Sequence, residues 1–114
     1  MVTNNQNMHI DLEEKERVEF APDDLFLFKI PCKDKISPCR ITLQYEVQLS
    51  KINIYVSTKF HKPSKQLCEQ YFLNGQPGRI IVPFKEQPYI YLALESKETQ
   101  ALSMSVQFPT ARKR

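Results

Sequence analysis

The chain has 114 residues and a mass of 13.4 kDa, the size of one domain. Its only two glycines, Gly75 and Gly78, cannot build a phosphate-binding loop of the G-x-G-x-x-G or G-x-x-x-x-G-K type, and so low a glycine content excludes collagen-like and linker proteins. The formal net charge of +3 divides unevenly, since residues 1–28 hold seven acids and two bases (−5) and residues 29–114 hold six acids and fourteen bases (+8). This division is compatible with three interpretations. The basic residues 29–114 bind an acidic partner, the acidic N-terminal segment folds back onto its own domain, or the charges simply form a solvated surface.

The N-terminus and the cysteines bear on the cellular compartment. The first residues show neither the basic region nor the apolar region of a signal peptide, and apolar stretches such as Leu25–Phe28 are far too short to span a bilayer. An odd number of cysteines, Cys32, Cys39 and Cys68, is typical of free thiols in a reducing compartment. These cysteines and His61 would make four metal ligands on paper, but no C-x-x-C pair anchors them. We therefore expect an intracellular, cytoplasmic protein that is not secreted and has no metal or other cofactor.

The N-terminal residues 1–17 are expected to form an acidic leader that is flexible or ordered by a partner. Residues 10–17 leave two alternatives open. A short helix is supported by Asp11–Lys15 and Glu13–Arg17, which are i, i+4 ion pairs in the favourable order. The sequence of residues 10–17 is equally compatible with an extended segment that lies along a neighbour, because its apolar positions form no helical stripe.

From Val18 onward the apolar residues recur with a period of two, as in β-strands. The alternation predicts strands over residues 25–30, 40–47, 52–57, 80–84, 89–94 and 101–108, and residues 67–73 favour a further strand over a helical turn. Pro83 should place its strand at an edge or end it, since proline donates no ladder hydrogen bond. Asp23 and Asp24 indicate a turn that enters a strand.

This succession of short strands predicts an all-β fold, a single antiparallel β-sandwich of the jelly-roll type with about seven or eight strands. We expect the sandwich to span residues 18–109, after the irregular leader at 1–17 and before a basic tail at 110–114.

No catalytic constellation is apparent in the sequence. His9 lies in the leader and His61 in a lysine-rich loop, and the G-x-S-x-G, H-E-x-x-H and D-x-D-x-D patterns do not occur. We therefore expect a protein that is not an enzyme. A basic β-barrel of the OB type, which stacks single-stranded nucleic acid on tyrosines, is the alternative function. Tyr45 is not available for that purpose, because it falls on the apolar side of its strand.

The outward positions of the last two predicted strands suggest an interaction module instead. Tyr89, Tyr91 and Ala93, and likewise Ala101, Ser103 and Ser105, are aromatic or small rather than charged. Such a face is suited to docking unless a second sheet covers it. The candidate partner-binding residues combine these tyrosines with the two basic loops: Lys33, Lys35, Lys59, His61, Lys62, Lys65, Tyr89 and Tyr91.

The order of the predicted strands carries a family resemblance over residues 18–108. The segments concerned are Phe26-Leu-Phe-Lys-Ile-Pro31, Arg40-Ile-Thr-Leu-Gln-Tyr-Glu46, Asn53-Ile-Tyr-Val-Ser57, Gly78-Arg-Ile-Ile-Val82, Tyr89-Ile-Tyr-Leu-Ala93 and Leu102-Ser-Met-Ser-Val-Gln-Phe108. This series resembles the bacterial pre-peptidase C-terminal (PPC-like) β-sandwich family. Where that family has a D-x-D-L-Y-V-like strand, this chain has Lys51 and Asn53 at the acidic positions, so a calcium or carbohydrate role that those acids imply is not carried over.

The resemblance implies a non-catalytic sandwich used as an accessory or docking domain. Together with the absence of catalytic motifs, it leads us to expect a structural or adaptor subunit that contacts other proteins in a larger intracellular assembly, with a cytoskeletal or ciliary complex as one setting. An OB-like protein that binds single-stranded nucleic acid remains the alternative.

Overall fold

The structure is a computed structural model that describes residues 10–12, 15–46, 51–74 and 78–110. The predictions made for residues 1–9, for the turn around 75–77 and for the tail at 111–114 lie outside the described residues. Nine strands form in the described part: β1 (Ile10–Asp11), β2 (Lys15–Phe20), β3 (Asp24–Pro31), β4 (Cys39–Tyr45), β5 (Ile52–Ser57), β6 (Gln70–Phe72), β7 (Arg79–Val82), β8 (Tyr89–Ser96) and β9 (Gln100–Gln107).

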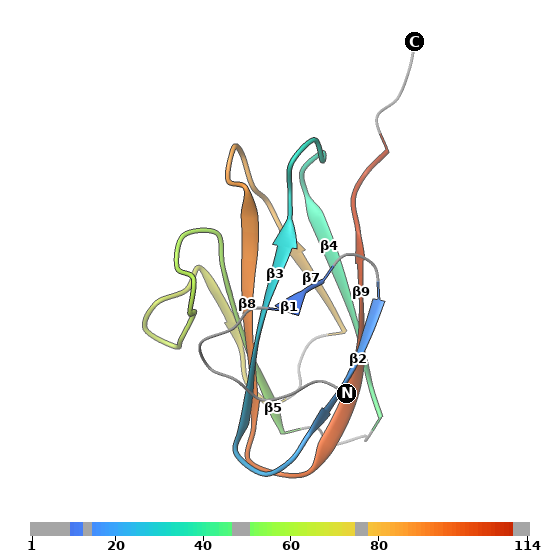
Figure 1. The fold of residues 1–114 in the computed structure, drawn as a ribbon, viewed down its shortest axis with the longest axis vertical. Coiled ribbons are helices and arrows are strands. Elements are labelled where there is room, and N and C mark those ends of the chain that lie inside the picture. Colours follow the sequence, from blue (N-terminus) through green and yellow to red (C-terminus); the bar gives the residue numbers. More distant parts are fainter. Residues whose placement is uncertain (1–9, 13–14, 47–50, 75–77, 111–114) are drawn as a thin grey trace.

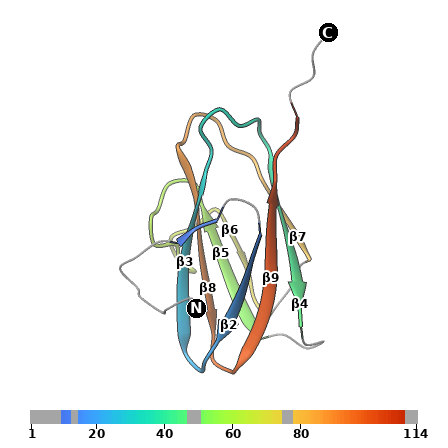
Figure 2. The ribbon, with the colours of Figure 1, turned by 45° about the vertical axis from the view of Figure 1, so that its right-hand side comes forward.

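The strands build two sheets that pack face to face (Figures 1 and 2). Sheet A has the order β1-β3-β8-β5-β6 and sheet B the order β2-β9-β4-β7. All pairs are antiparallel except β1, which runs parallel to β3. The predicted all-β sandwich is confirmed. The strand count exceeds the expected seven or eight because the N-terminal segment contributes β1 and the first half of β2.

The core lies between the sheets and follows from the period of two in the sequence. Every second residue of β8, from Ile90 through Leu92 to Leu94, is buried against sheet B, whose strand β9 contributes Leu102 and Met104. Aromatic rings from the two sheets meet in the same core. Phe20 contacts Phe26 edge to face at 5.2 Å between ring centroids, a preferred geometry for aromatic pairs.

The described part of the predicted leader is extended and belongs to the sandwich. It crosses from β1 in sheet A to β2 in sheet B, and Leu12 between them is buried in the core. The helical alternative for residues 10–17 is therefore wrong. The charges that would have paired along a helix pair across strands instead, since Asp11 lies 3.9 Å from Lys29 and Arg17 contacts Glu46. Burial of Leu12 and Val18 accounts for the extended form.

Acidic and amide residues make turns that glycine often supplies. Asp23, Asp34 and Asn74 have φ of 67°, 62° and 62°, in the left-handed region that Asp and Asn tolerate best after glycine. The predicted strand-entry turn at Asp23 and Asp24 is confirmed, and the Asp24 carboxylate accepts a 2.8 Å hydrogen bond from the Ala21 N–H. The prediction for Pro83 is also confirmed, since β7 ends at Val82 and forms an edge of sheet B.

Leu12 tests whether the N-terminal segment is part of the folded unit. Leu12→Ala should lower the free energy of unfolding by about 2–5 kcal/mol, the usual loss when a buried leucine is truncated. The neighbouring Asp11→Ala is the control, because its exposed ion pair with Lys29 contributes little. Urea unfolding followed by circular dichroism measures both. A Leu12 variant as stable as the control would contradict an integral segment.

The three cysteines are free and differ in environment, which predicts an order of reactivity. Burial raises the pKa of Cys32 to about 11 and that of Cys39 to about 12, so both remain protonated near the ordinary thiol pKa of about 8.5. Cys68 is only half-buried. Iodoacetamide should therefore alkylate Cys68 first, and Cys32 and Cys39 only on unfolding, as read by peptide mass spectrometry. Equal labelling of all three in the folded protein would contradict this assignment.

Candidate docking surface

The outer face of sheet A carries the tyrosines singled out by the sequence. In β8, Tyr89 and Tyr91 alternate with core residues and so point away from sheet B. Tyr91 pairs with Lys29 of β3 on one side and with Ser57 of β5 on the other. The register of three strands thus places a lysine, a tyrosine and the start of the loop after β5 in one row.

The side chains of this row stack against one another. The Lys29 ammonium lies 4.8 Å from the centre of the Tyr89 ring, a cation–π geometry. The Tyr89 and Tyr91 rings are 6.1 Å apart, and the His61 ring lies 4.6 Å from that of Tyr91. Both tyrosines are half-buried and His61 is exposed. We call this group the tyrosine surface: Lys29, Tyr89, Tyr91 and His61, with Lys59, Lys62 and Lys65 of the adjoining loop.

The loop over residues 58–69 is held to the sheet by Ser57, the buried residue that ends β5. Its hydroxyl donates to the Glu69 carboxylate at 3.0 Å and accepts from the N–H groups of Lys59 at 2.9 Å and Phe60 at 2.8 Å. Glu69 also accepts from the hydroxyl and the N–H of Thr58. One buried hydroxyl and one carboxylate therefore tie the two ends of the loop together beside Tyr91.

The same loop covers part of the sheet through an apolar contact. Leu27, Tyr55 and Ala93 form a small buried cluster on the outer face, and Cys68 packs against it. The Tyr55 hydroxyl donates to Glu95 at 2.7 Å, and burial together with this bond raises the pKa of the phenol. Ala93 is therefore not available for docking, because a loop rather than a second sheet covers it. Tyr89 and Tyr91 lie beyond this cover.

Charge on the tyrosine surface is predominantly basic, because the surface includes four lysines, while two neighbouring carboxylates keep their charge but are held by neutral hydrogen-bond donors. Glu69 caps the loop and Glu95 accepts hydrogen bonds from Tyr55 and Asn53. Within the described residues, Lys59 and Lys65 form no ion pair. A tyrosine hydroxyl, with an ordinary pKa of about 10, is neutral at physiological pH, and burial and the adjacent Tyr89 raise the pKa of Tyr91 further. The surface thus combines neutral rings with lysine ammonium groups.

The structure divides the predicted site residues between two places. His61, Tyr89 and Tyr91 are brought together, with Lys59, Lys62 and Lys65 on the loop that carries His61. Lys33 and Lys35 lie in the connection from β3 to β4, which leaves β3 beside the start of β8, and the Lys35 ammonium is 5.5 Å from the Phe108 ring rather than in the stacked row. Sequence reasoning missed Lys29. Its position on the outer parity of its strand was visible, but its partner Tyr89 could not be found without the pairing of β3 with β8.

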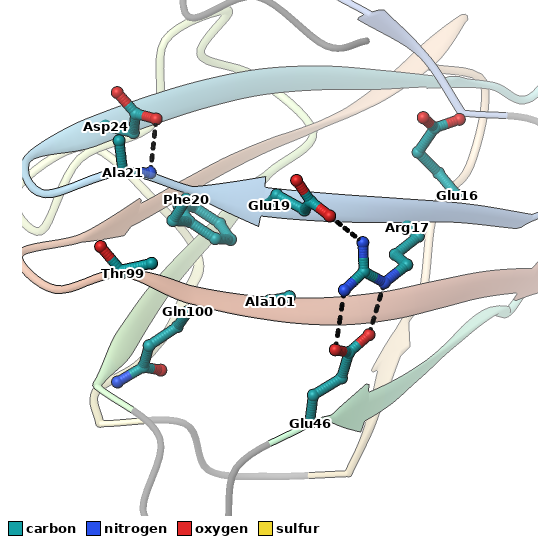
Figure 3. A pocket seen from close by; sticks show the side chains of 10 residues that line it. All are labelled: Glu16, Arg17, Glu19, Phe20, Ala21, Asp24, Glu46, Thr99, Gln100 and Ala101. Atoms are coloured by element: carbon teal, nitrogen blue, oxygen red, sulfur yellow. Dashed lines mark hydrogen bonds and ion pairs between the residues drawn. The ribbon is translucent and has the colours of Figure 1, made fainter.

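A separate hollow of about 900 Å³ lies on sheet B and is shown in Figure 3. Arg17 is held there by two bonds to the Glu46 carboxylate, at 2.6 and 2.8 Å, and by a contact with Glu19. The guanidinium lowers the pKa of Glu46, and each of its three nitrogens already donates to Glu46 or Glu19. Because the paired donors of Arg17 are bound to the Glu46 carboxylate, we assign no recognition role to this hollow.

Across residues 10–12, 15–46, 51–74 and 78–110, no three side chains of His, Cys, Asp or Glu gather closely enough to hold a metal ion. The same part of the chain forms no helix with the length and apolar character needed to cross a membrane.

Comparison with known proteins identifies the architecture. No family model and no curated protein sequence matches the chain. Among solved structures, the pre-peptidase C-terminal domain of collagenase from Bacillus anthracis superposes with a TM-score of 0.56 at 14% identity, covering 87% of this chain and 92% of that one. The fold is a PPC-like β-sandwich. Aeromonas hydrophila PliG, a periplasmic inhibitor of g-type lysozyme, shares it with a TM-score of 0.55 at 10% identity, covering 87% of this chain and 97% of that one.

The resemblance noted in the sequence is therefore confirmed for the fold. The chain is a two-sheet sandwich rather than the OB-type barrel that the alternative function assumed. Sequence identities of 14% and 10% show a shared architecture alone. The role of the tyrosine surface therefore has to follow from its own residues.

Ser57 tests how the loop is held. Ser57→Ala should lower the free energy of unfolding by about 1–3 kcal/mol, because the Glu69 carboxylate and two backbone N–H groups lose a buried partner. It should also speed hydrogen exchange at the amides of Lys59 and Phe60. Ser105→Ala is the control, since this half-buried serine of β9 makes no side-chain hydrogen bond in the described structure. Unchanged exchange at both amides would refute the anchor.

Proposed function

We propose that this protein is a non-catalytic adaptor that docks onto another protein through the tyrosine surface. The observation that carries the proposal is the stacked row of Lys29, Tyr89, Tyr91 and His61 on the outer face of sheet A. Tyrosine is enriched at protein interfaces because a rigid ring offers a large contact area with a polar tip and loses little conformational entropy. Half-buried rings that are already held by neighbours need little further ordering on binding.

The charge of the surface favours an acidic protein partner. The 58–69 loop presents Lys59 and Lys65 without an ion pair in the described residues, next to neutral tyrosine rings. Charges at the rim of an interface mainly raise the association rate and select partners of opposite sign. The lysozyme inhibitor among the solved structures has a protein as its target, so a sandwich of this type is compatible with such a role.

We place this adaptor in a larger intracellular assembly, with a cytoskeletal or ciliary complex as one setting. The support for an intracellular location is the set of three free thiols, two of which are buried with raised pKa values. Binding of single-stranded nucleic acid is the competing use of the same rings and lysines.

Co-purification from native extract tests the proposal. The double variant Tyr89→Ala, Tyr91→Ala should lose its partner protein, with affinity reduced at least about tenfold, as is usual for tyrosines at the centre of an interface. Lys59→Glu with Lys65→Glu should weaken binding mainly through the association rate, and these exposed positions leave the fold intact. Gln44→Ala, at an exposed position of β4 in sheet B, should bind as the native protein does.

Three results would count against the adaptor. One is a native protein that remains a free monomer at every salt concentration. Another is undiminished co-purification by both surface variants after circular dichroism has confirmed their fold. The third is tight binding of a single-stranded oligonucleotide that weakens steeply with salt, which would favour the nucleic-acid function instead.

A further inference from the structure

A second candidate recognition site lies at the end of the sandwich where β3 ends and β8 begins, on the side of sheet B rather than on the outer face of sheet A that carries the tyrosine surface. Three segments meet there: the connection from β3 to β4, the connection from β7 to β8, and the end of β9 (Figures 1 and 2). Two hydrogen bonds join the two connections, from the Cys32 N–H to the Pro88 carbonyl at 2.8 Å and from the Phe84 N–H to the Ser37 hydroxyl at 3.1 Å. Phe108 packs edge to face on Phe84 at 6.0 Å.

A pocket of about 370 Å³ opens at this end and is defined here as the end pocket. Its lining residues are Pro38, Arg40, Gln107, Phe108 and Pro109. Prolines and an aromatic ring give it a rigid apolar wall, which requires little ordering when a ligand binds. Among these five lining residues, Arg40 alone has a charged side chain.

The guanidinium of Arg40 is exposed and makes no hydrogen bond or ion pair within the described residues. Arg17, on the same outer face of sheet B, differs from Arg40 because each of its three guanidinium nitrogens donates to Glu46 or Glu19. An arginine with vacant donors can bind a carboxylate through two parallel hydrogen bonds. The end pocket therefore places a free carboxylate-binding group beside an apolar wall.

The residues around the pocket are, like Arg40, positively charged on balance. Residues 32–40, 83–88 and 107–110 together carry four bases and two acids, a net of +2. One of the bases, Lys35, holds its ammonium 5.5 Å from the Phe108 ring, at the pocket wall. The exposed Ile81 lies beside Arg40 on the neighbouring strand, because the two residues are paired between β7 and β4.

We infer that the end pocket binds an acidic segment of a partner protein, with a Glu or Asp carboxylate on Arg40 and an adjacent apolar side chain against Phe108 and Pro38. This goes beyond the docking proposed for the tyrosine surface and does not depend on it. The chain would then contact proteins through two separate surfaces and could bridge them.

Titration of ¹⁵N-labelled protein with short peptides tests the inference. The probe is an unstructured peptide in which glutamates alternate with leucine and proline, and its partner probe has every glutamate replaced by glutamine. The acidic peptide should shift the amide signals of Arg40, Gln107 and Phe108 and the side-chain signal of Arg40. The glutamine peptide should bind at least about tenfold more weakly, the usual loss when a charge-assisted hydrogen bond is removed.

Variants locate the binding group. Arg40→Gln should lower the affinity for the acidic peptide at least about tenfold. Arg40→Lys should recover only part of this affinity, because lysine lacks the paired donors. Arg17→Gln is the matched control and should bind as the native chain does, because Arg17 is already engaged by Glu46. Both positions carry exposed side chains, so folding is retained in all three variants and is checked by the amide spectrum.

Several outcomes would overturn the inference: no shifts near Arg40 at millimolar acidic peptide, equal affinity of the glutamine peptide, or equal loss in the Arg17 control. A phosphoserine version of the peptide that binds when the glutamate version does not would overturn the carboxylate assignment. Loss of binding in the Tyr89, Tyr91 double variant, with Arg40 intact, would place the peptide on the tyrosine surface instead.

Discussion

The pairing of β8 with β3 on one side and β5 on the other determines both the core and the tyrosine surface. Because side chains alternate along a strand, Ile90, Leu92 and Leu94 fill the core only when Tyr89 and Tyr91 face outward. A slip of one residue would exchange these sets and bury two phenols in place of aliphatic side chains. The stability of the core therefore also fixes the position of the tyrosines.

The outer face of sheet A is shaped by a loop rather than by a further layer of structure. Ser57 and Glu69 close the loop, and Cys68 packs it onto the cluster around Ala93. This arrangement protects the apolar part of the face from water and leaves the row from Lys29 to His61 half-exposed. The face is thus neither fully sealed nor strongly apolar.

The sequence pattern predicted the architecture well because inner and outer residues alternate cleanly in strands such as β4, where Ile41 and Leu43 are buried. It left the N-terminal segment undecided, since Leu12 is a single apolar residue whose burial depends on two sheets meeting around it. The candidate site could be predicted only in part. Tyr89 and Tyr91 were identified from parity, whereas the contributions of Lys29 and Ser57 depend on strand pairing, which no local pattern specifies.

The central claim is that the tyrosine surface meets another protein, and crosslinking mass spectrometry in native extract tests it most directly. Lys59 and Lys65 flank the surface, whereas the exposed Lys51 and Lys97 lie at the opposite end of sheet A, before β5 and after β8. We predict that Lys59 and Lys65 crosslink to one partner protein and that Lys51 and Lys97 do not. Intermolecular crosslinks that are absent from the loop lysines, or equally frequent at all four positions, would contradict the account.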